Sequence, residues 1–263
     1  MESTPLRPGR LEALLGVTLF QRHARGVALT PEGRLLADAT GAALQDLQSV
    51  LATLKGAGQE QNLRITCLPS FASAWLVPRL PRFTVAHPGL RLVVDTDRAL
   101  ARFDAGGPDL GIRYGPGRWP GLDAQHLMDD ALFPVASPTL PGVDAIQAPR
   151  DIARLPLIAD LAMEGWREWF RAAGVRSVAR AGEAHSFSDT HDALRAAAAG
   201  LGAALARRTL AGPLLAGGQL LRLPGPELPT RFAYYVVWPE HRPPSPAANA
   251  FLRWLQAEAT AQA

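Results

Sequence analysis

The alternation of strand-like and helix-like segments over residues 62–263 constrains the fold of this chain more than any other feature. Short runs of β-branched and apolar residues are typical of buried strands, and longer amphipathic runs are typical of helices. Because strands that alternate with helices pack as a parallel sheet covered by helices, the pattern predicts an α/β fold. The expected strands are Leu63–Leu68, Leu90–Val94, Asp109–Tyr114, Leu132–Ala136, Gly202–Leu205, Leu220–Leu223 and Phe232–Trp238, and the expected helices are Ser73–Thr84, Gly165–Ala173, Thr190–Ala199 and Pro246–Ala257.

The composition is compatible with a large packed core and gives no sign of a nucleic-acid-binding surface. Apolar residues make up 48% and charged residues 19% of the chain, so disorder is not expected. All but one of the 27 basic residues are arginines, yet the net charge is only +3. A nucleic-acid-binding face would need the arginines to cluster, and they are mostly scattered along the chain.

Three sequence features favour a cytoplasmic location. The segment Met1–Arg10 contains two prolines and no apolar run, so no signal peptide is expected. No stretch approaches ~20 uninterrupted apolar residues, so no membrane span is expected. Cys67 is the only cysteine, which excludes an intrachain disulfide, fits a reducing compartment and favours a buried strand position.

The N-terminal part of the chain follows a different pattern. Leu11–Leu15 is expected to be helical, and two short strand-like pieces flank the basic turn Gln21–Gly26 as a hairpin. Thr30 is a suitable N-cap for a long helix that begins at Pro31 and extends to about Lys55.

Leucines in the second half of this long helix follow a 3-4-3 spacing. Such a stripe favours a coiled-coil-like seam between two copies of the helix, and the alternative is an ordinary amphipathic helix lying on a core. The leucines concerned are Leu44, Leu47, Leu51 and Leu54.

Two groups of motifs resemble the LysR-type transcriptional regulators. In the first, Leu11-Glu12, Leu15-Gly16, Leu19-Phe20 with Arg22, and Leu29-Thr30 with Gly33 match the end of the family's winged helix and the start of its linker helix. In the second, four downstream segments resemble the subgroup that controls glycine cleavage and β-lactamase expression. These segments are Asp109–Leu122, Phe133–Pro138, Trp166–Trp169 and Ala197–Ala204.

The resemblance implies a type-2 periplasmic-binding-protein-like sensor domain of two lobes joined by two crossover strands. A partial winged helix and a long linker helix are expected to precede it. The implied division is a winged-helix remnant over 1–30, a linker and dimerisation helix over 31–58, and an effector-binding domain over 62–263, with lobe I at about 62–138 plus 240–263 and lobe II at about 139–239.

The start of the chain departs from the family pattern. Intact members carry a complete helix-turn-helix before the Leu-Glu motif, and here Pro5 and Pro8 would break the recognition helix. The base-reading helices are therefore expected to be missing, with DNA binding only where they are supplied. The basic residues expected to contact the DNA backbone from the wing are Arg22, His23 and Arg25.

Two apparent helix starts carry the residues expected to bind an effector. Ligands of open α/β sheets bind beyond the carboxyl ends of strands, and free backbone N–H groups with nearby hydroxyls hold anions. The simpler alternative is that Ser73 and Asp189 or Thr190 are only N-caps. Asp189 would repel an anion, but it could bind an amine of the ligand. The residues expected at these helix starts are Ser70, Phe71, Ser188, Asp189 and Thr190.

Five more residues are expected at the same cleft. Asp95 and Thr96 follow the predicted strand Leu90–Val94, and the resemblance places them, with Arg98, at the cleft mouth. Tyr114 and Tyr234 are expected to be cleft walls or packing residues. The tryptophans Trp119, Trp166 and Trp169 are expected to belong to the core.

No cofactor, metal site or catalytic residue is expected. His185 and His191 lie six residues apart, unlike the i, i+4 spacing of a helical zinc pair, and no Gly-x-Ser-x-Gly elbow, Walker loop or CxxC occurs. The leading hypothesis is a regulator that senses a small, anionic effector and assembles as a homodimer or homotetramer. The alternatives are a sensing module that does not itself bind DNA, a solute-binding protein, which the missing signal peptide disfavours, and an enzyme, which nothing supports.

Overall fold

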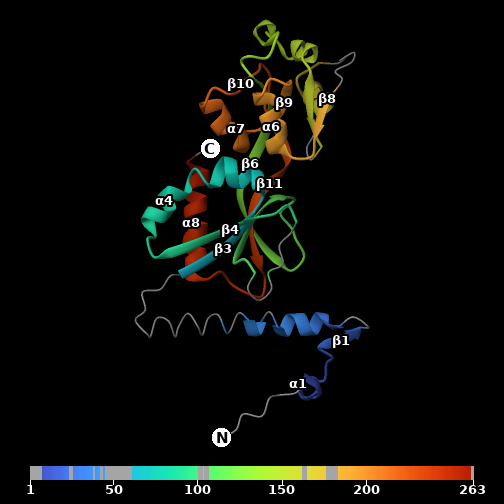
Figure 1. Ribbon diagram of the computed structural model, residues 1–263, viewed down its shortest axis with the longest axis vertical. Helices are drawn as coiled ribbons and strands as arrows, with labels where there is room; N and C mark the ends of the chain where they lie inside the picture. Colours follow the sequence, from blue (N-terminus) through green and yellow to red (C-terminus); the bar gives the residue numbers. More distant parts are fainter. Residues whose placement is uncertain are drawn as a thin grey trace.

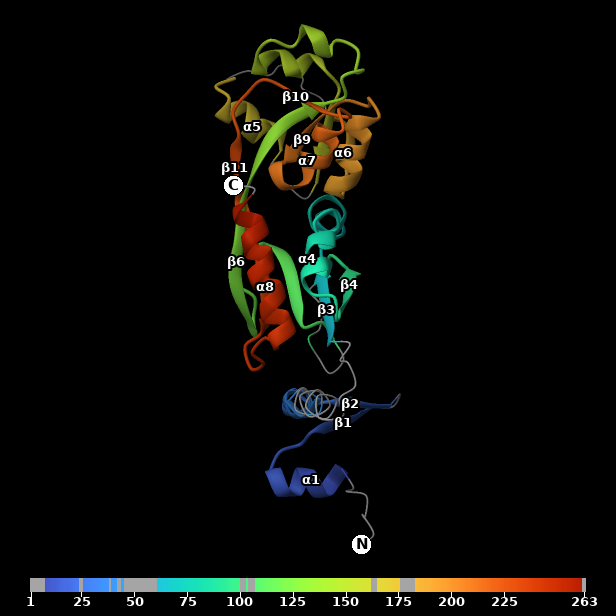
Figure 2. The same ribbon diagram turned by 90° about the vertical axis from the view of Figure 1, so that its left-hand side faces the viewer.

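The computed structural model describes residues 8–23, 26–37, 39–41, 44, 61–99, 103, 107–161, 165–175 and 183–261. Figures 1 and 2 show two stacked α/β lobes, with a small N-terminal group of elements at the far end of the molecule from α5. The helices are α1 (Pro8–Leu15), α3 (Pro69–Phe71), η1 (Ala72–Leu76), α4 (Leu80–Ala86), η2 (Val143–Ala145), η3 (Pro149–Arg154), α5 (Trp166–Ala172), α6 (Thr190–Ala198), α7 (Arg208–Ala216) and α8 (Pro246–Thr260).

The N-terminal elements confirm the predicted helix and hairpin. Strands β1 (Phe20–His23) and β2 (Gly26–Leu29) pair antiparallel. The Glu12 carboxylate of α1 accepts the backbone N–H groups of Leu19 and Phe20, at 2.7 and 3.1 Å, and so ties the helix to the hairpin.

Thr30 is the predicted N-cap, because its hydroxyl accepts the N–H of Gly33 at 2.9 Å. A side chain at Gly33 would meet the backbone oxygen of Leu19 at 2.0 Å, which explains why the Leu-Thr-x-x-Gly motif ends in glycine. Residues 31–37, 39–41 and 44 are helical. Of the predicted leucine seam only Leu44 is described; Leu47, Leu51 and Leu54 lie outside the described residues, as does Arg25 of the wing.

One curved sheet runs through both lobes in the order β4-β3-β5-β11-β6-β9-β7-β8, with β10 paired to β6. The sheet is mixed: β3 is parallel to β4 and β5, β7 is parallel to β8 and β9, and β11 is antiparallel to both its neighbours. The strands are β3 (Gln61–Cys67), β4 (Leu90–Thr96), β5 (Leu110–Gly115), β6 (Leu122–Ala136), β7 (Leu157–Asp160), β8 (Glu183–Phe187), β9 (Ala203–Arg207), β10 (Leu221–Arg222) and β11 (Leu228–Pro239).

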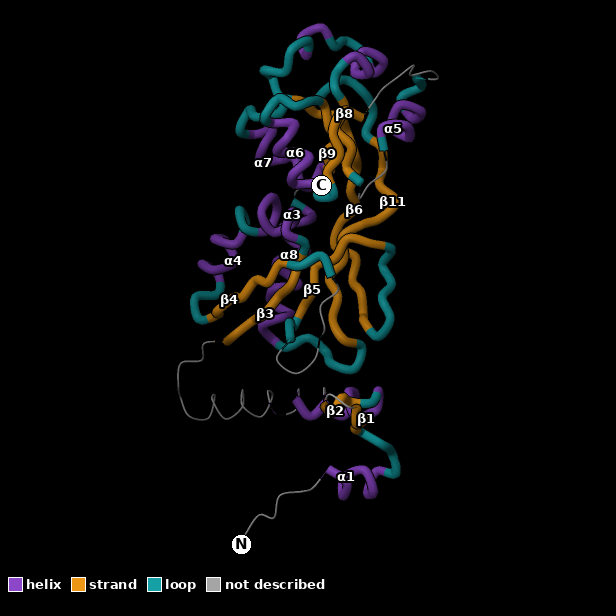
Figure 3. The backbone as a smooth tube through the Cα atoms, turned by 45° about the vertical axis from the view of Figure 1, so that its right-hand side comes forward, coloured by secondary structure: helices purple, strands orange, loops and turns teal. Residues whose placement is uncertain are grey.

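Two long strands connect the lobes, as Figure 3 shows for β6 and β11. The last residues of β6, from Leu132 to Val135, pair with β9 of one lobe. The last residues of β11, from Ala233 to Val237, pair with β5 of the other lobe. The pairing between β6 and β11 shifts register between Pro229 and Ala233, so the crossing point lies there.

Buried apolar side chains form separate cores in the two lobes. One core lies between β3, β5, β11 and the helices α3, η1 and α8, and it includes Trp75, Tyr234 and Phe251. The other lobe has two clusters, one around Trp166 and Trp169 and one between α6, α7 and β9. This arrangement confirms the predicted two-lobed α/β fold.

Several sequence predictions about these elements were wrong or incomplete. The helix expected to begin at Ser73 begins at Pro69, and Ser73 is no N-cap, because its hydroxyl donates to the backbone oxygens of Pro69 and Ser70. Pro78 has no N–H to continue the helix, and the preceding N–H of Val77 bonds five residues back, which makes η1 a π-helical turn.

Strands β7 and β8 and helix α7 were not predicted, and β6 is much longer than the expected Leu132–Ala136. Trp166 and Trp169 are buried as predicted, whereas Trp119 is half-buried and packs on Tyr235. In the part of the chain that the structure describes, no helix is both long and apolar enough to cross a bilayer.

Candidate functional site

The carboxyl ends of parallel strands from the two lobes lie close together at the centre of the molecule. In one lobe, β3 and β4 end near Ser70 and Arg98, and in the other, β7 and β9 end at Asp160 and Arg207. This edge is where open α/β sheets place their ligands, because the helices that follow the strands begin there.

Arg207 is the central side chain of this region. It is the last residue of β9, and only 5% of its surface is exposed. Its guanidinium lies 4.5 Å from the ring centre of Tyr114, and its Nη1 donates to the Tyr234 hydroxyl at 3.2 Å. Its Nη2 donates to the Thr190 hydroxyl at 2.8 Å. The polar cluster formed by Arg207, Thr190, Tyr234 and Asp160 is called the arginine cluster below.

Thr190 connects Arg207 to a carboxylate. Its hydroxyl accepts from Arg207 and donates its own proton to Asp160 Oδ2 at 2.6 Å. Thr190 is the first residue of α6 and is buried, so the hydroxyl is held in one orientation by both partners.

Among the residues that the structure describes, the charge of Arg207 has no direct partner of opposite sign. Among the described residues no carboxylate lies within ion-pair distance of it, and its Nε has no hydrogen-bond partner. Burial would lower the pKa of Arg207, but the nearby tyrosines, Asp130 and Asp160 together raise it, so the group is cationic. A buried cation that lacks a counterion is costly, and an anion bound beside it would offset that cost.

Asp130, on the crossing segment of β6, is the second buried charge of this region. Burial raises the pKa of its carboxyl, against the opposing effect of the N–H groups of Thr209 and Ala131 that bond to Oδ1. Its Oδ2 has no partner in the described part of the chain.

An aromatic stack supports the arginine cluster from the first lobe. The ring of Tyr234 lies 4.8 Å from Phe71 and 5.0 Å from Tyr114, and Phe71 lies 5.0 Å from Trp75. Tyr234 is fully buried, and this burial raises the pKa of its hydroxyl. The hydroxyl is therefore protonated and can donate a hydrogen bond to a ligand.

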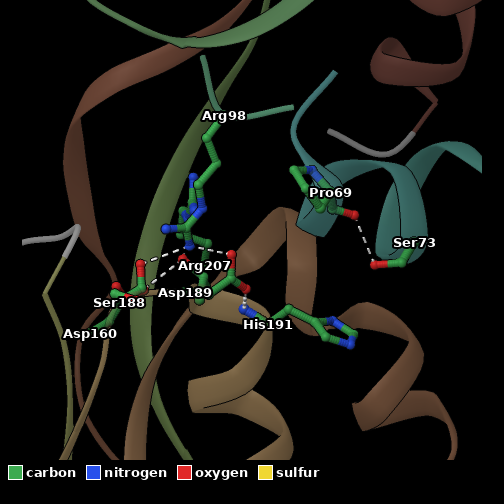
Figure 4. Close-up of polar contacts among 9 residues, drawn as sticks. Pro69, Ser73, Arg98, Asp160, Ser188, Asp189, His191 and Arg207 are labelled. Carbon is green, nitrogen blue, oxygen red and sulfur yellow. Dashed lines mark hydrogen bonds and ion pairs between the residues drawn. The ribbon is translucent and has the colours of Figure 1, made fainter. Parts of the chain in front are cut away.

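A charged contact joins the two lobes at the edge of the cluster, as Figure 4 shows. Arg98, in the loop after β4, donates to the carboxylate of Asp189 and, at 2.7 Å, to the backbone oxygen of Ser188. Asp189 is the N-cap of α6, since its side chain accepts the N–H of His191 at 2.8 Å. Partial burial would raise the pKa of Asp189, but the hydrogen bonds from Arg98 and His191 lower it overall.

A cavity of about 260 Å³ lies beside this region, between the helices of the two lobes. Ser70 lies in its wall, whereas Arg207 and Thr190 do not. The cavity is lined by Ser70, Ser73, Ala74, His191, Leu194, Arg195, Leu210, Pro213, Leu214 and Gln219.

The structure brings seven of the nine predicted effector-site residues together. Tyr114, Thr190 and Tyr234 surround Arg207; Ser188 and Asp189 meet Arg98; Phe71 packs on Tyr234, and Ser70 precedes Phe71 in α3.

The structure does not bring Asp95 or Thr96 into this group. Both are exposed on the edge strand β4, and Asp95 pairs with Arg64 at 3.4 Å instead. Of the predicted wing residues, Arg22 and His23 lie in β1, and His23 is exposed.

Arg207 and Asp160 were missed by sequence reasoning. Both end short apolar runs, Ala203–Arg207 and Leu157–Asp160, and a charged residue directly after buried strand residues is the signal that could have found them.

Cys67 is fully buried, and burial raises the pKa of its thiol to about 11, so it is a core residue as predicted. In the described ranges no group of three or more His, Cys, Asp or Glu side chains is placed to hold a metal ion.

Comparison with known proteins agrees with this two-lobed architecture. Residues 56–260 match the family described as LysR substrate binding domain. The chain is 32% identical over 246 residues to the HTH-type transcriptional activator AmpR of Rhodobacter capsulatus, covering 94% of this chain and 83% of AmpR. It is also 32% identical over 254 residues to the glycine cleavage system transcriptional activator of Escherichia coli K12, covering 96% of this chain and 83% of the relative.

Solved structures show the same fold. The AmpR effector binding domain from Citrobacter freundii superimposes with a TM-score of 0.68 at 29% identity, covering 76% of this chain and 99% of that domain. The effector domain of AmpR from Pseudomonas aeruginosa gives 0.67 at 28% identity, covering 77% and 97%. The chain belongs to the LysR family of transcriptional regulators and carries the effector-binding domain of that family.

Proposed function

We propose that this regulator binds a small anionic effector between its lobes and that Arg207 neutralises the charge of that effector. The observation that carries the proposal is the buried guanidinium with no carboxylate within ion-pair distance among the described residues. The Tyr234 and Thr190 hydroxyls hold Arg207 in place, and Ser70 and the start of α6 supply further polar groups nearby.

The two separate cores support a division of residues 62–263 into two lobes with a hinge in the crossing strands. We place the crossing near Asp130–Leu132 in β6 and Pro229–Ala233 in β11, since both strands change partners there. This assigns residues 233–239 to lobe I, whereas the sequence alone suggested lobe II. Residues 1–30 are the wing-bearing segment and 31–58 the linker helix of the same proposal.

Effector binding is coupled to regulation through the arrangement of the lobes. An effector shifts that arrangement only if it binds one arrangement more tightly than the other. Arg98 belongs to one lobe and Asp189 to the other, so a change in the arrangement of the lobes would alter their contact directly. The regulator works as an oligomer in the cytoplasm, through the linker helix and the sensor domain. Where the base-reading helices are supplied, Arg22, His23 and Arg25 of the wing contact DNA phosphates.

A thermal-shift screen with matched ligand pairs tests the anionic effector. Monocarboxylates and dicarboxylates are compared with their neutral amides on the 263-residue chain, because a ligand at 100 times its Kd stabilises the folded state by about 2.7 kcal/mol. We expect hits among the acids and none among their amides.

Variants at Arg207 assign a hit to the arginine cluster. Arg207→Lys keeps the charge and should retain weakened binding, whereas Arg207→Met should lose binding by more than tenfold. Arg154→Gln, at an exposed arginine of η3, is the matched control. Equal affinity of an acid for Arg207→Met and the unaltered protein, with both folded by circular dichroism, would overturn the proposal.

A further inference from the structure

The cavity between the helices has walls from both lobes. Ser70, Ser73 and Ala74 come from α3 and η1 of lobe I, and the facing wall comes from α6 and α7 of lobe II. Ser73 and His191 line the cavity, whereas Arg98 and Arg207 do not; Figure 4 draws the His191 ring and the Ser73 hydroxyl apart from the two guanidinium groups. The cavity therefore adjoins the arginine cluster, shares Ser70 with its surroundings, and is lined by none of the four residues that form the cluster.

The lining of this cavity combines an apolar wall with two basic side chains. Leu194 and Leu210 are buried core residues, and Leu214 packs beside them. His191 and Arg195 are four residues apart on α6, so they lie on the same face of the helix. None of the residues that line the cavity is an aspartate or a glutamate.

Arg195 is exposed and makes no ion pair with any residue that the structure describes. Its charge is available to a ligand in the cavity, and neither Arg98 nor Arg207 is among the residues that line that cavity. Ser70, Ser73 and Gln219 add polar side chains to the lining.

The volume limits the size of the occupant. Pockets for drug-sized ligands usually measure ~300–1,000 Å³, and this cavity measures about 260 Å³. A ligand of about a dozen non-hydrogen atoms would fill it at the packing density of a protein interior.

We propose that this cavity is a second ligand site, which takes a small amphiphilic monoanion such as a medium-chain or aryl carboxylate. The hydrocarbon part packs on Leu194, Leu210 and Leu214, and the carboxylate lies against Arg195 and His191. Because one wall belongs to each lobe, a ligand bound here holds α3 and η1 against α6 and α7, and so biases the same lobe arrangement as an effector at the arginine cluster.

The π-helical turn η1 supports the assignment, because it supplies Ser73 and Ala74 to the wall. Single π-helical turns occur often at functional sites. Here the turn sets the distance between the lobe I wall and α7, against which it packs.

Octanoate is the probe that tests this site, measured by isothermal titration calorimetry on the full 263-residue chain. Butyrate is the short-chain control and octylamine the control of opposite charge. We expect octanoate to bind at millimolar or lower concentration and both controls to bind at least tenfold more weakly. Absence of octanoate binding at 5 mM, or equal binding of octylamine, would overturn the proposal.

Two variants locate the bound octanoate. Ala74→Phe fills the cavity from a half-buried wall position, and Ala86→Phe places the same side chain at an exposed position of α4. Arg195→Glu reverses the charge at this wall, with Arg167→Glu at an exposed position of α5 as its control. We expect more than tenfold weaker binding for Ala74→Phe, several-fold weaker binding for Arg195→Glu, and no change in either control.

Arg207→Lys separates this proposal from the effector site of the arginine cluster. Octanoate binding should be unaffected by that substitution. If Arg207→Lys weakens octanoate binding while Arg195→Glu leaves it unchanged, octanoate occupies the arginine cluster and the second site is rejected. Because Arg195 is exposed, its variant remains informative even if Ala74→Phe does not fold.

Discussion

The hydroxyl of Thr190 stabilises the folded protein by an amount that can be estimated from its contacts. It is 3% exposed, donates to Asp160 at 2.6 Å and accepts from Arg207 at 2.8 Å. Thr190→Val keeps the shape of the side chain but removes both bonds and leaves two buried charged groups with fewer partners. Hydrogen bonds to charged groups contribute about 1.5–3 kcal/mol each, and bonds in one network overlap, so we expect a loss of about 3 kcal/mol.

Thr190→Ser is the matched control for this substitution. It keeps the hydroxyl and removes one buried methyl group, which costs about 1 kcal/mol. For a domain of this size, 1 kcal/mol changes Tm by about 2–4 °C. The valine variant should therefore melt about 6–12 °C below the unaltered protein, and the serine variant should lose about a third of that.

Thermal denaturation followed by circular dichroism measures both variants under one buffer condition. The valine variant should remain folded at 25 °C, because domains are usually stable by about 5–15 kcal/mol. If valine and serine lower Tm equally, the hydroxyl contributes nothing beyond packing, and the proposed connection from Arg207 through Thr190 to Asp160 is wrong.

Three further predictions follow from other contacts. Arg98→Gln should increase the radius of gyration in small-angle X-ray scattering, because it removes the ion pair between the lobes. It should change the free energy of unfolding by at most about 1 kcal/mol, since Arg98 is half exposed. An unchanged radius of gyration would show that the contact does not hold the lobes together. The lowered pKa of Asp189 means that its contribution to stability is present above the unfolded value of about 3.9 and lost as the pH falls through the folded value. Carboxyl NMR titration should therefore show a higher pKa for Asp189 in Arg98→Gln than in the unaltered protein. Gly202→Ala should destabilise by about 1–3 kcal/mol in urea unfolding, because its Cβ would lie 2.3 Å from the backbone oxygen of Pro156, whereas Gly212→Ala, with open space around its Cβ, should not.

The fold could be predicted largely from the sequence, because apolar runs and helix starts are local signals. The long strands were the exception. The first half of β6 carries Asp123, Gln125 and His126, which are typical of a loop, and it becomes a strand only because β11 pairs along it. Helix α7 was missed since Gly212 and Pro213 interrupt its sequence, and packing on β6, β9 and η1 holds it together instead.

The candidate site could be predicted only in part. Helix starts pointed to Ser70, Asp189 and Thr190, because a hydroxyl or carboxylate at such a position is visible in one short segment. Arg207 was not visible in this way, since its role depends on Tyr114, Thr190 and Tyr234 from three other elements. The pairing of Asp95 with Arg64 was not predicted for the related reason that alternation along a strand does not say which neighbour will take the charge.

The path of the chain through the two crossing strands has a consequence for biosynthesis. Lobe II is one continuous segment, about residues 132–229, whereas lobe I needs β11 and α8 from the end of the chain to complete the sheet and cover its core. Domains fold as units while the chain leaves the ribosome, so lobe II can reach its native core while lobe I is still incomplete. We therefore expect the Cys67 thiol, in the core of lobe I, to stay reactive until β11 and α8 have left the ribosome, and its loss of reactivity to mark the completion of that core.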